Sequence, residues 1–139
     1  MTPVRPLVIV ALALTAAVAP AVAGTSPVRA TMATSSTEPL VDTPWRYTIV
    51  VSNRAGKPLV AKAKLQILVG TLVVGCWKVT EIVQCSGANA GTWIPFKGKR
   101  TGVIRWPARS AGVKLTFQAT VVAGGRALKL RAPVTVRLP

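Results

Sequence analysis

Residues 113–136 have the sequence VKLTFQATVVAGGRALKLRAPVTV, and this stretch decides the fold. Apolar side chains alternate with polar ones before and after Gly124 and Gly125, and this two-residue period is typical of a half-buried β-strand. Paired glycines adopt the positive φ values of tight hairpin turns, so the stretch predicts two antiparallel strands joined at these glycines. Pro133 cannot donate a hydrogen bond to a central ladder, so we expect the second strand at a sheet edge or at a bulge.

The same alternation recurs earlier in the chain. Residues 45–52 and 59–69 each place large or small apolar side chains on one face, and turn-forming residues separate the two segments. A helix is the weaker alternative for residues 59–69. Shorter strands are expected at residues 91–96 and 102–107, so turn signals recur about every ten residues, as in sandwiches and barrels. We therefore expect an all-β, antiparallel β-sandwich of about seven strands.

Cys76 and Cys85 are the two cysteines of the chain, and such a pair in an exported protein is expected to form a disulfide. If the intervening residues fold into a hairpin centred on Thr80 and Glu81, Cys76 faces Cys85 at a non-hydrogen-bonded position, where a bridge is geometrically favourable. A four-residue loop over the same register is an equal alternative. A redox or metal site is disfavoured, because the spacing is not C-x-x-C and the chain has no histidine.

The beginning of the chain has the parts of a secretory signal peptide. Arg5 precedes an apolar run at residues 7–18, and an A-x-A-like sequence ends at Ala23. A membrane anchor is the alternative, but a spanning helix needs about 20 apolar residues and Pro20 closes this run earlier. We expect residues 1–23 to be cleaved and the protein to be secreted, either free or associated with the cell wall.

The remaining chain is expected to form one folded domain behind a tether. Residues 24–43 are rich in serine, threonine, proline and alanine without a periodic pattern, which predicts a flexible tether. Residues 44–139 then have the length of a single domain with one core.

The charge of the chain excludes most kinds of catalysis. Eighteen lysines and arginines stand against three acids, and the formal net charge is +15. Proton transfer, metal binding and activation of a nucleophile by a triad draw on histidine, aspartate and glutamate, of which only Glu38, Asp42 and Glu81 are present. We therefore expect a protein that is not an enzyme and that needs no cofactor or metal.

Several segments resemble the Ig-like modules of exported bacterial proteins, which are similar to fibronectin-type and bacterial Ig-like sandwiches. The segments that carry this resemblance are Trp45-Arg46-Tyr47-Thr48, Ala55-Gly56-Lys57-Pro58-Leu59, Ile104-Arg105-Trp106-Pro107-Ala108-Arg109, Gly112-Val113-Lys114-Leu115-Thr116-Phe117 and Ala123-Gly124-Gly125. The resemblance implies a sandwich fold and an extracellular setting, and it covers most of residues 45–138. The chain departs from antibody domains, because its cysteines are too close together to link two distant strands.

A basic and aromatic segment near the middle of the chain is the candidate binding site. It could hold an anionic ligand through Lys97, Lys99, Arg100, Arg105, Arg109 and Lys114, with aromatic contacts from Trp93 and Phe96. Cations of this density bind a polyanion by releasing counterions, and an aromatic face stacks on a sugar or base. The alternative is that Trp93, Phe96 and Trp106 belong to the core while the cations only cover loops and outer faces.

Two functions from different classes follow from the sequence. The first is a structural or protein-interaction module whose partner is another envelope or secreted protein. The second is electrostatic binding of an anionic polymer, such as a cell-wall polyanion, an acidic lipid surface or, less favoured, nucleic acid, through residues 97–114.

Overall fold

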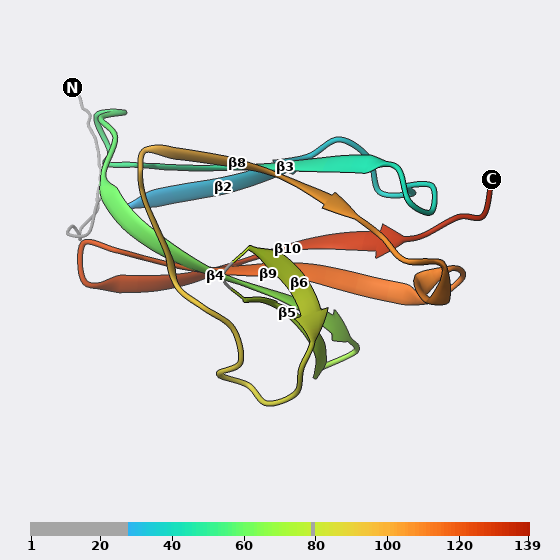
Figure 1. Ribbon diagram of the computed structural model, residues 1–139. Helices are drawn as coiled ribbons and strands as arrows, with labels where there is room; N and C mark the ends of the chain where they lie inside the picture. The colour runs from blue at the N-terminus through green and yellow to red at the C-terminus, as the bar shows by residue number, and fades with distance from the viewer. Residues whose placement is uncertain (1–27, 79) are drawn as a thin grey trace, which may run out of the picture.

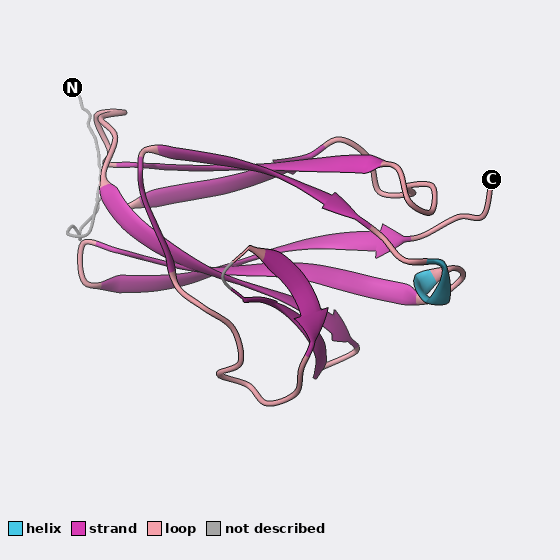
Figure 2. Cartoon of the chain, in the orientation of Figure 1, coloured by secondary structure: helices cyan, strands magenta, loops and turns pink. Residues whose placement is uncertain are grey.

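The structure is a computed structural model that describes residues 28–78 and 80–139. The predicted signal peptide, residues 1–23, and the first residues of the predicted tether lie outside this described part. Nearly all of the described secondary structure is β-strand (Figure 2). Its helical content is one short 3₁₀ turn, η2, at Ala108–Ser110, and no helix in residues 28–78 or 80–139 is long and apolar enough to cross a membrane.

The strands form two antiparallel sheets that pack face to face as a β-sandwich (Figure 1). The strands are β2 (Arg29–Thr34), β3 (Pro44–Ser52), β4 (Val60–Val69), β5 (Leu72–Lys78), β6 (Glu81–Gln84), β7 (Ile94–Lys97), β8 (Lys99–Arg105), β9 (Lys114–Ala123) and β10 (Arg126–Thr135). The larger sheet has six strands in the order β10-β9-β4-β5-β6, with β7 also pairing with β4. The smaller sheet has three strands in the order β2-β3-β8. Each sheet therefore has one face toward the core and one outer face.

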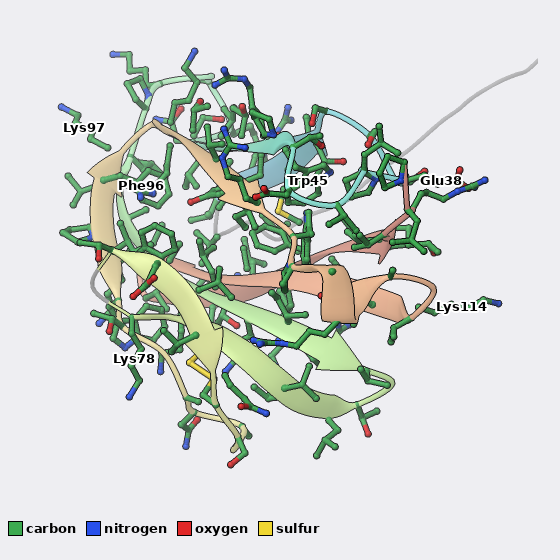
Figure 3. The ribbon with its side chains drawn as sticks, turned by 45° about the vertical axis from the view of Figure 1, so that its right-hand side comes forward. Glu38, Trp45, Lys78, Phe96, Lys97 and Lys114 are labelled. Atoms are coloured by element: carbon green, nitrogen blue, oxygen red, sulfur yellow. A yellow bond between two sulfur atoms is a disulfide. The ribbon has the colours of Figure 1, made fainter. Side chains whose placement is uncertain are left out.

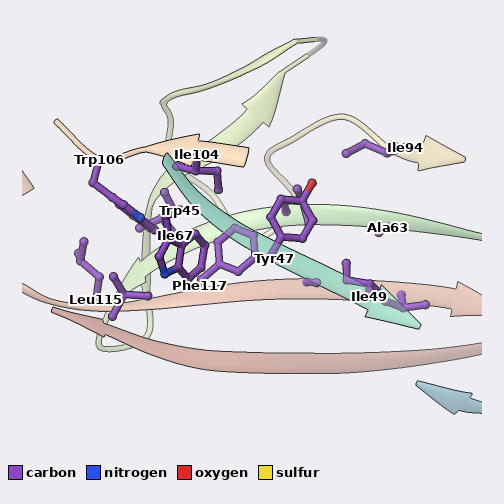
Figure 4. Packing of buried hydrophobic residues seen from close by; sticks show 14 of the residues in the cluster. Trp45, Tyr47, Ile49, Ala63, Ile67, Ile94, Ile104, Trp106, Leu115 and Phe117 are labelled. Atoms are coloured by element: carbon purple, nitrogen blue, oxygen red, sulfur yellow. The ribbon is translucent and has the colours of Figure 1, made fainter. Parts of the chain in front are cut away.

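The core forms between the two sheets, where the apolar side chains at alternate positions of their strands pack against each other. Trp45 and Tyr47 of β3 are 1% exposed and pack on Phe117 of β9, with ring centroids 5.2 Å and 5.1 Å from the Phe117 ring (Figure 4). Trp106 packs edge-on against Trp45 at 5.3 Å. Aromatic rings at these distances add to the stability that burial of their apolar area provides. The alternation found in the sequence is thus the alternation between core and outer face.

The chain passes from the larger sheet to the smaller one at a single buried residue, Gly98, between β7 and β8. Its N–H donates to the carbonyl of Leu59, and its carbonyl accepts from the N–H of Val51. Gly98 has a φ of +77°, and a Cβ there would lie 2.6 Å from the Cβ of Pro58. Glycine is required at this crossing by both its backbone conformation and the lack of space.

The strand predictions for the four long segments are confirmed. β3, β4, β9 and β10 cover nearly all of the expected residues, and residues 60–69 are strand rather than helix. Gly124 and Gly125 both have positive φ at the β9–β10 turn, as the hairpin prediction requires. Pro133 lies in β10, which is the edge strand of the larger sheet.

The prediction of a flexible tether over residues 24–43 is wrong for most of its described part. Residues 29–34 form β2, which pairs with β3 along its whole length, from Arg29 opposite Ser52 to Thr34 opposite Tyr47. Its side chains alternate between exposed and half-buried positions, and Ala30 and Met32 pack against the core. Small side chains and a short strand gave too weak a period for the sequence to indicate this.

The segment after β2 is also attached to the body of the protein. Leu40 forms a parallel bridge with Arg137, and Val41 and Arg137 are further joined by a hydrogen bond from the Val41 N–H to the Arg137 carbonyl. The N–H groups of Thr135 and Arg137 donate to the carbonyls of Thr37 and Pro39. Residues 37–41 and the C-terminal residues 135–137 therefore hold each other in place.

The disulfide between Cys76 and Cys85 is confirmed, with the two Cα atoms 6.0 Å apart. The predicted hairpin register is wrong, because Lys78 faces Glu81 and Cys76 faces Val83. Cys85 therefore lies beyond the end of β6 instead of opposite Cys76. The bridge joins β5 to the start of the segment that leads to β7, and so it ties down residues 85–93 as well as the hairpin.

Candidate functional site

The six cations of the predicted site are spread over different parts of the sandwich. Lys97 ends β7, three of the others lie on β8, Arg109 is in η2, and Lys114 begins β9. Figure 3 shows Lys97 and Lys114 on opposite sides of the molecule. Lys99 and Arg105 lie on the outer face of the three-stranded sheet, since their strand partners Val50 and Pro44 are exposed. Proximity in the sequence did not bring these side chains together, because successive strands belong to different sheets.

Arg100 has the opposite orientation from Lys99, because it faces buried Ile49 across the ladder. Its Nε donates to the Tyr47 hydroxyl at 3.4 Å, and its Cζ lies 6.0 Å from the centre of the Trp77 ring. Arg100 is half-buried, so its guanidinium lies against aromatic rings at the edge of the core.

The three aromatic side chains considered in the sequence have three different environments. Trp106 is 1% exposed and belongs to the core. Phe96 is half-buried and packs against the core. Trp93 lies instead with Lys62 and Lys64, whose Nζ atoms are 4.7 Å and 4.5 Å from the centre of its ring. Among these three, Trp93 is thus the residue that combines an aromatic ring with nearby cations.

The outer face of the three-stranded sheet combines exposed apolar groups with cations. We call this surface the three-strand face, and it comprises Arg46, Thr48, Val50, Lys99, Thr101, Val103 and Arg105. Val50 is 41% exposed and Val103 is 44% exposed, and the hydrogen-bonded pair of Thr48 and Thr101 lies between them. β3 and β8 contain no acidic residue. The face is a flat sheet surface whose only formal charges are positive.

The outer face of the six-stranded sheet gathers cations that are far apart in the sequence. We call this surface the six-strand face, and four of its cations come from β4 and β10: Lys62, Lys64, Lys129 and Arg131. Lys97 of β7, opposite Val60, and Lys114 of β9, opposite Thr135, lie on the same face at the ends of their strands. Lys129 and Lys64 occupy one row across the sheet, since both lie opposite Thr120 of β9. The alternation along each strand accounts for the outward orientation of these cations, but their proximity depends on strand order and register, which the sequence did not indicate.

A chain of hydrogen bonds crosses the six-strand face in the next row. The Nε of Arg131 donates to Oε1 of Gln118 at 2.8 Å, and Nε2 of Gln118 donates to Oε1 of Gln66 at 3.2 Å. Nε2 of Gln66 then donates to the carbonyls of Ala88 and Ala90 at 2.9 Å and 2.8 Å. Both glutamines are 3% exposed. Buried amides that are hydrogen-bonded in this way hold their neighbours in fixed positions.

The hydrogen-bonded row of Arg131, Gln118 and Gln66 borders a cavity on the six-strand face. The cavity has a volume of about 480 Å³ and is lined by the two glutamines, by the β4–β5 turn, by the segment after the disulfide and by two cations of β10. These lining residues include Thr71, Gly87, Ala88, Lys129 and Arg131. Leu68, Leu72 and Val73 line the same hollow, so it combines polar and cationic groups with an apolar part and suits a negatively charged ligand that also has an apolar surface.

A second cavity lies on the opposite face of the same part of β4, between the two sheets. It has a volume of about 280 Å³, and its lining is mainly apolar, including Ile67, Ile82 and Leu115. Arg105 and Arg109 also line it. The buried Nε1 of Trp106, another lining residue, has no hydrogen-bond partner among the described residues.

The acidic residues do little to balance these cations. Glu38 forms an ion pair with Arg137, with Nη1 and Oε1 2.6 Å apart, and both side chains are more than half exposed. Such exposed pairs contribute little to stability.

No protein-family model and no curated protein matches the chain.

Proposed function

We propose that this chain is a secreted, non-catalytic Ig-like module that binds another protein of the bacterial envelope or exterior. The observation that carries the proposal is the three-strand face, where two exposed valines and a threonine pair are surrounded by cations. Protein interfaces commonly combine an apolar centre with a polar rim. The resemblance to Ig-like modules and the disulfide support the extracellular setting.

The chemistry of this face indicates what kind of partner would fit. Val50 and Val103 would lose their contact with water on docking, while Arg46 and Lys99 would remain near the rim. A complementary partner therefore carries an apolar strip with acidic residues around it. The cations would raise the rate of association at low salt, and the apolar centre would supply the affinity that remains at high salt.

The test is capture of partners from the producer's own envelope and culture fluid at low and high salt, with Val50→Glu beside the wild type. A carboxylate placed in the apolar centre should weaken the captured complex by about tenfold or more. The matched control is Val60→Glu, because Val60 is a valine of the other sheet that is 74% exposed. Equal capture by both variants would refute binding through the three-strand face, and circular dichroism establishes that both variants are folded.

A second candidate function is binding of an anionic polymer. The observation that favours it is the six-strand face, where four cations gather on two strands that contain no acidic residue. Electrostatic repulsion among such cations is relieved when an anionic polymer binds. Binding of this kind weakens linearly in the logarithm of salt concentration, with a slope of roughly −0.7 to −0.9 per neutralised phosphate for nucleic acid. Affinity that does not change with salt would exclude it.

A further inference from the structure

We propose that the six-strand face, where β10, β9 and β4 meet residues 85–93, is a binding site for an acidic polysaccharide that it holds through carboxylate groups. The inference rests on the second candidate function, and it assigns that function to a surface other than residues 97–114. It is carried by two groups of oriented cations, one at Arg131 and one at Trp93, on a single outer face.

The first group is the guanidinium of Arg131 at the cavity of about 480 Å³. Its Nε donates to the side chain of Gln118, and Gln118 donates to the side chain of Gln66. Gln66 in turn donates to the carbonyls of Ala88 and Ala90. Among the described residues, the Nη groups of Arg131 make no hydrogen bond. An arginine fixed at Nε presents its Nη groups in a defined direction, and these can donate to a carboxylate.

The surroundings of Arg131 favour a ligand that is rich in hydroxyl groups. Besides Arg131, the cavity is lined by polar or small residues, namely Thr71, Gly70, Gly87 and Lys129, and by the apolar residues Leu68, Leu72 and Val73. A sugar that carries a carboxylate offers both the anion and the hydroxyl groups for such a lining. The buried hydrogen-bonded floor is already ordered, so little ordering of the protein opposes binding.

The second group is the pair of lysines at Trp93. Both ammonium groups lie within 5 Å of the ring centre, and Nζ of Lys64 also donates to the carbonyl of Asn89 at 3.0 Å. These contacts restrict two side chains that would otherwise be free. Lys64 and Lys129 are two strands apart in one row, which corresponds to about 10 Å. A polymer with a carboxylate on successive units can therefore reach both groups at once, whereas a single small anion cannot.

The same contacts disfavour nucleic acid as the ligand. Proteins that bind single strands use free aromatic faces on which bases stack. On the described six-strand face, Trp93 has two ammonium groups over its ring. The indole therefore holds the lysines in place, and a base would have to displace them.

The test uses polygalacturonate, a polymer of uronic acid, and isothermal titration of the purified protein. Lys64→Gln combined with Lys129→Gln should reduce the affinity by about tenfold or more, because it removes the oriented cation at Trp93 and the cation that lines the cavity with Arg131. The matched control is Arg54→Gln combined with Lys57→Gln, which removes the same charge from an exposed turn. The affinity of the control variant for polygalacturonate should fall by no more than about threefold, which is the effect of the lower net charge alone.

A conservative variant separates orientation from charge. Arg131→Lys keeps the positive charge but loses the Nε–H that donates to Gln118. We expect several-fold weaker binding with an unchanged salt slope, because the number of cations stays the same. Thermal unfolding of each variant shows whether the fold is intact. If Arg131→Lys binds polygalacturonate as tightly as the wild type does, the oriented guanidinium has no role in binding.

The remaining outcomes distinguish the site from the function. Equal losses in the two double variants would overturn the site and leave polyanion binding by net charge intact. Binding to single-stranded DNA or to anionic lipid vesicles but not to polygalacturonate would overturn the polysaccharide assignment. Equal affinity for polygalacturonate and its neutral methyl ester would overturn the role of the carboxylates. Absence of binding to all of these polyanions would overturn the second candidate function together with the site.

Discussion

Gly98 joins the two sheets through backbone atoms alone. Its N–H and carbonyl bond to Leu59 and Val51, which belong to different parts of the sandwich. Its φ of +77° is a conformation that side chains other than that of glycine rarely adopt, and Pro58 occupies the space that a Cβ would need. A single residue therefore determines how β7 of the larger sheet continues into β8 of the smaller sheet.

We predict that Gly98→Ala lowers the free energy of unfolding by about 2–4 kcal/mol, because left-handed backbone strain and overlap with Pro58 add together. Gly56→Ala is the control, since Gly56 also has positive φ, +84°, but has no atom within 4 Å of an added Cβ. That variant should lose about 1 kcal/mol. Urea denaturation of both variants measures the difference, and equal losses would show that the contact with Pro58 has no cost.

At the scale of elements, the long strands could be predicted from the sequence, but the strands with which they pair could not. The alternation in residues 45–52 and 113–136 predicted β3, β9 and β10, because one face of each strand packs on the core. β2 was missed, since its small side chains are at most half-buried and leave little periodicity. The cysteine pairing was predicted correctly from composition and compartment, but the predicted hairpin register was wrong, because Cys76 faces Val83.

The candidate site depends on the part of the structure that the sequence could not predict. Outward orientation of Lys64 and Lys129 follows from the parity of their own strands. Their common row follows from the pairing of β9 with both β4 and β10. Trp93 could be identified as an aromatic residue next to cations, but its actual partners lie about thirty residues earlier in the chain. Pairing between distant segments created this surface.

The β5–β6 hairpin and residues 85–93 form one unit through the disulfide. We predict that Cys76→Ala combined with Cys85→Ala lowers the free energy of unfolding by roughly 2–3 kcal/mol, since the closed loop is short. Amide hydrogen exchange at Ala90 and Thr92 should also become faster, because their hydrogen bonds to Gly87 and Trp77 hold the segment that the bridge anchors. Unchanged exchange at both amides would show that Gln66 alone fixes this segment.

At the scale of the whole molecule, positive charge is distributed over both outer faces with almost no acid to balance it. The formal net charge is +15, and the ion pair of Glu38 with Arg137 is exposed. Repulsion between like charges is greater in the compact state than in the extended chain. Salt should therefore affect this protein differently from one that is stabilised by ion pairs.

We predict that raising sodium chloride from low to near-physiological concentration stabilises the fold by on the order of 1 kcal/mol, because screening weakens the repulsion. Thermal unfolding across a salt series measures this, with the wild type compared to the double variant Arg54→Gln and Lys57→Gln. The variant should depend less on salt. A melting temperature that falls with added salt would show that attractive charge pairs dominate.

The parallel pairing of residues 37–41 with residues 135–137 has a mechanical consequence. Val28 lies beside Gly124, just before β10 begins, and Thr37 bonds to Thr135, where β10 ends. The start of the described chain and the C-terminus therefore lie at opposite ends of the sandwich (Figure 1). A pulling force applied through the two chain ends would run along the strands. The hydrogen bonds from Thr135 and Arg137 to Thr37 and Pro39 would then be loaded together in shear, instead of opening one after another. We therefore expect this module to resist a force along its length better than a force that separates the two segments one hydrogen bond at a time.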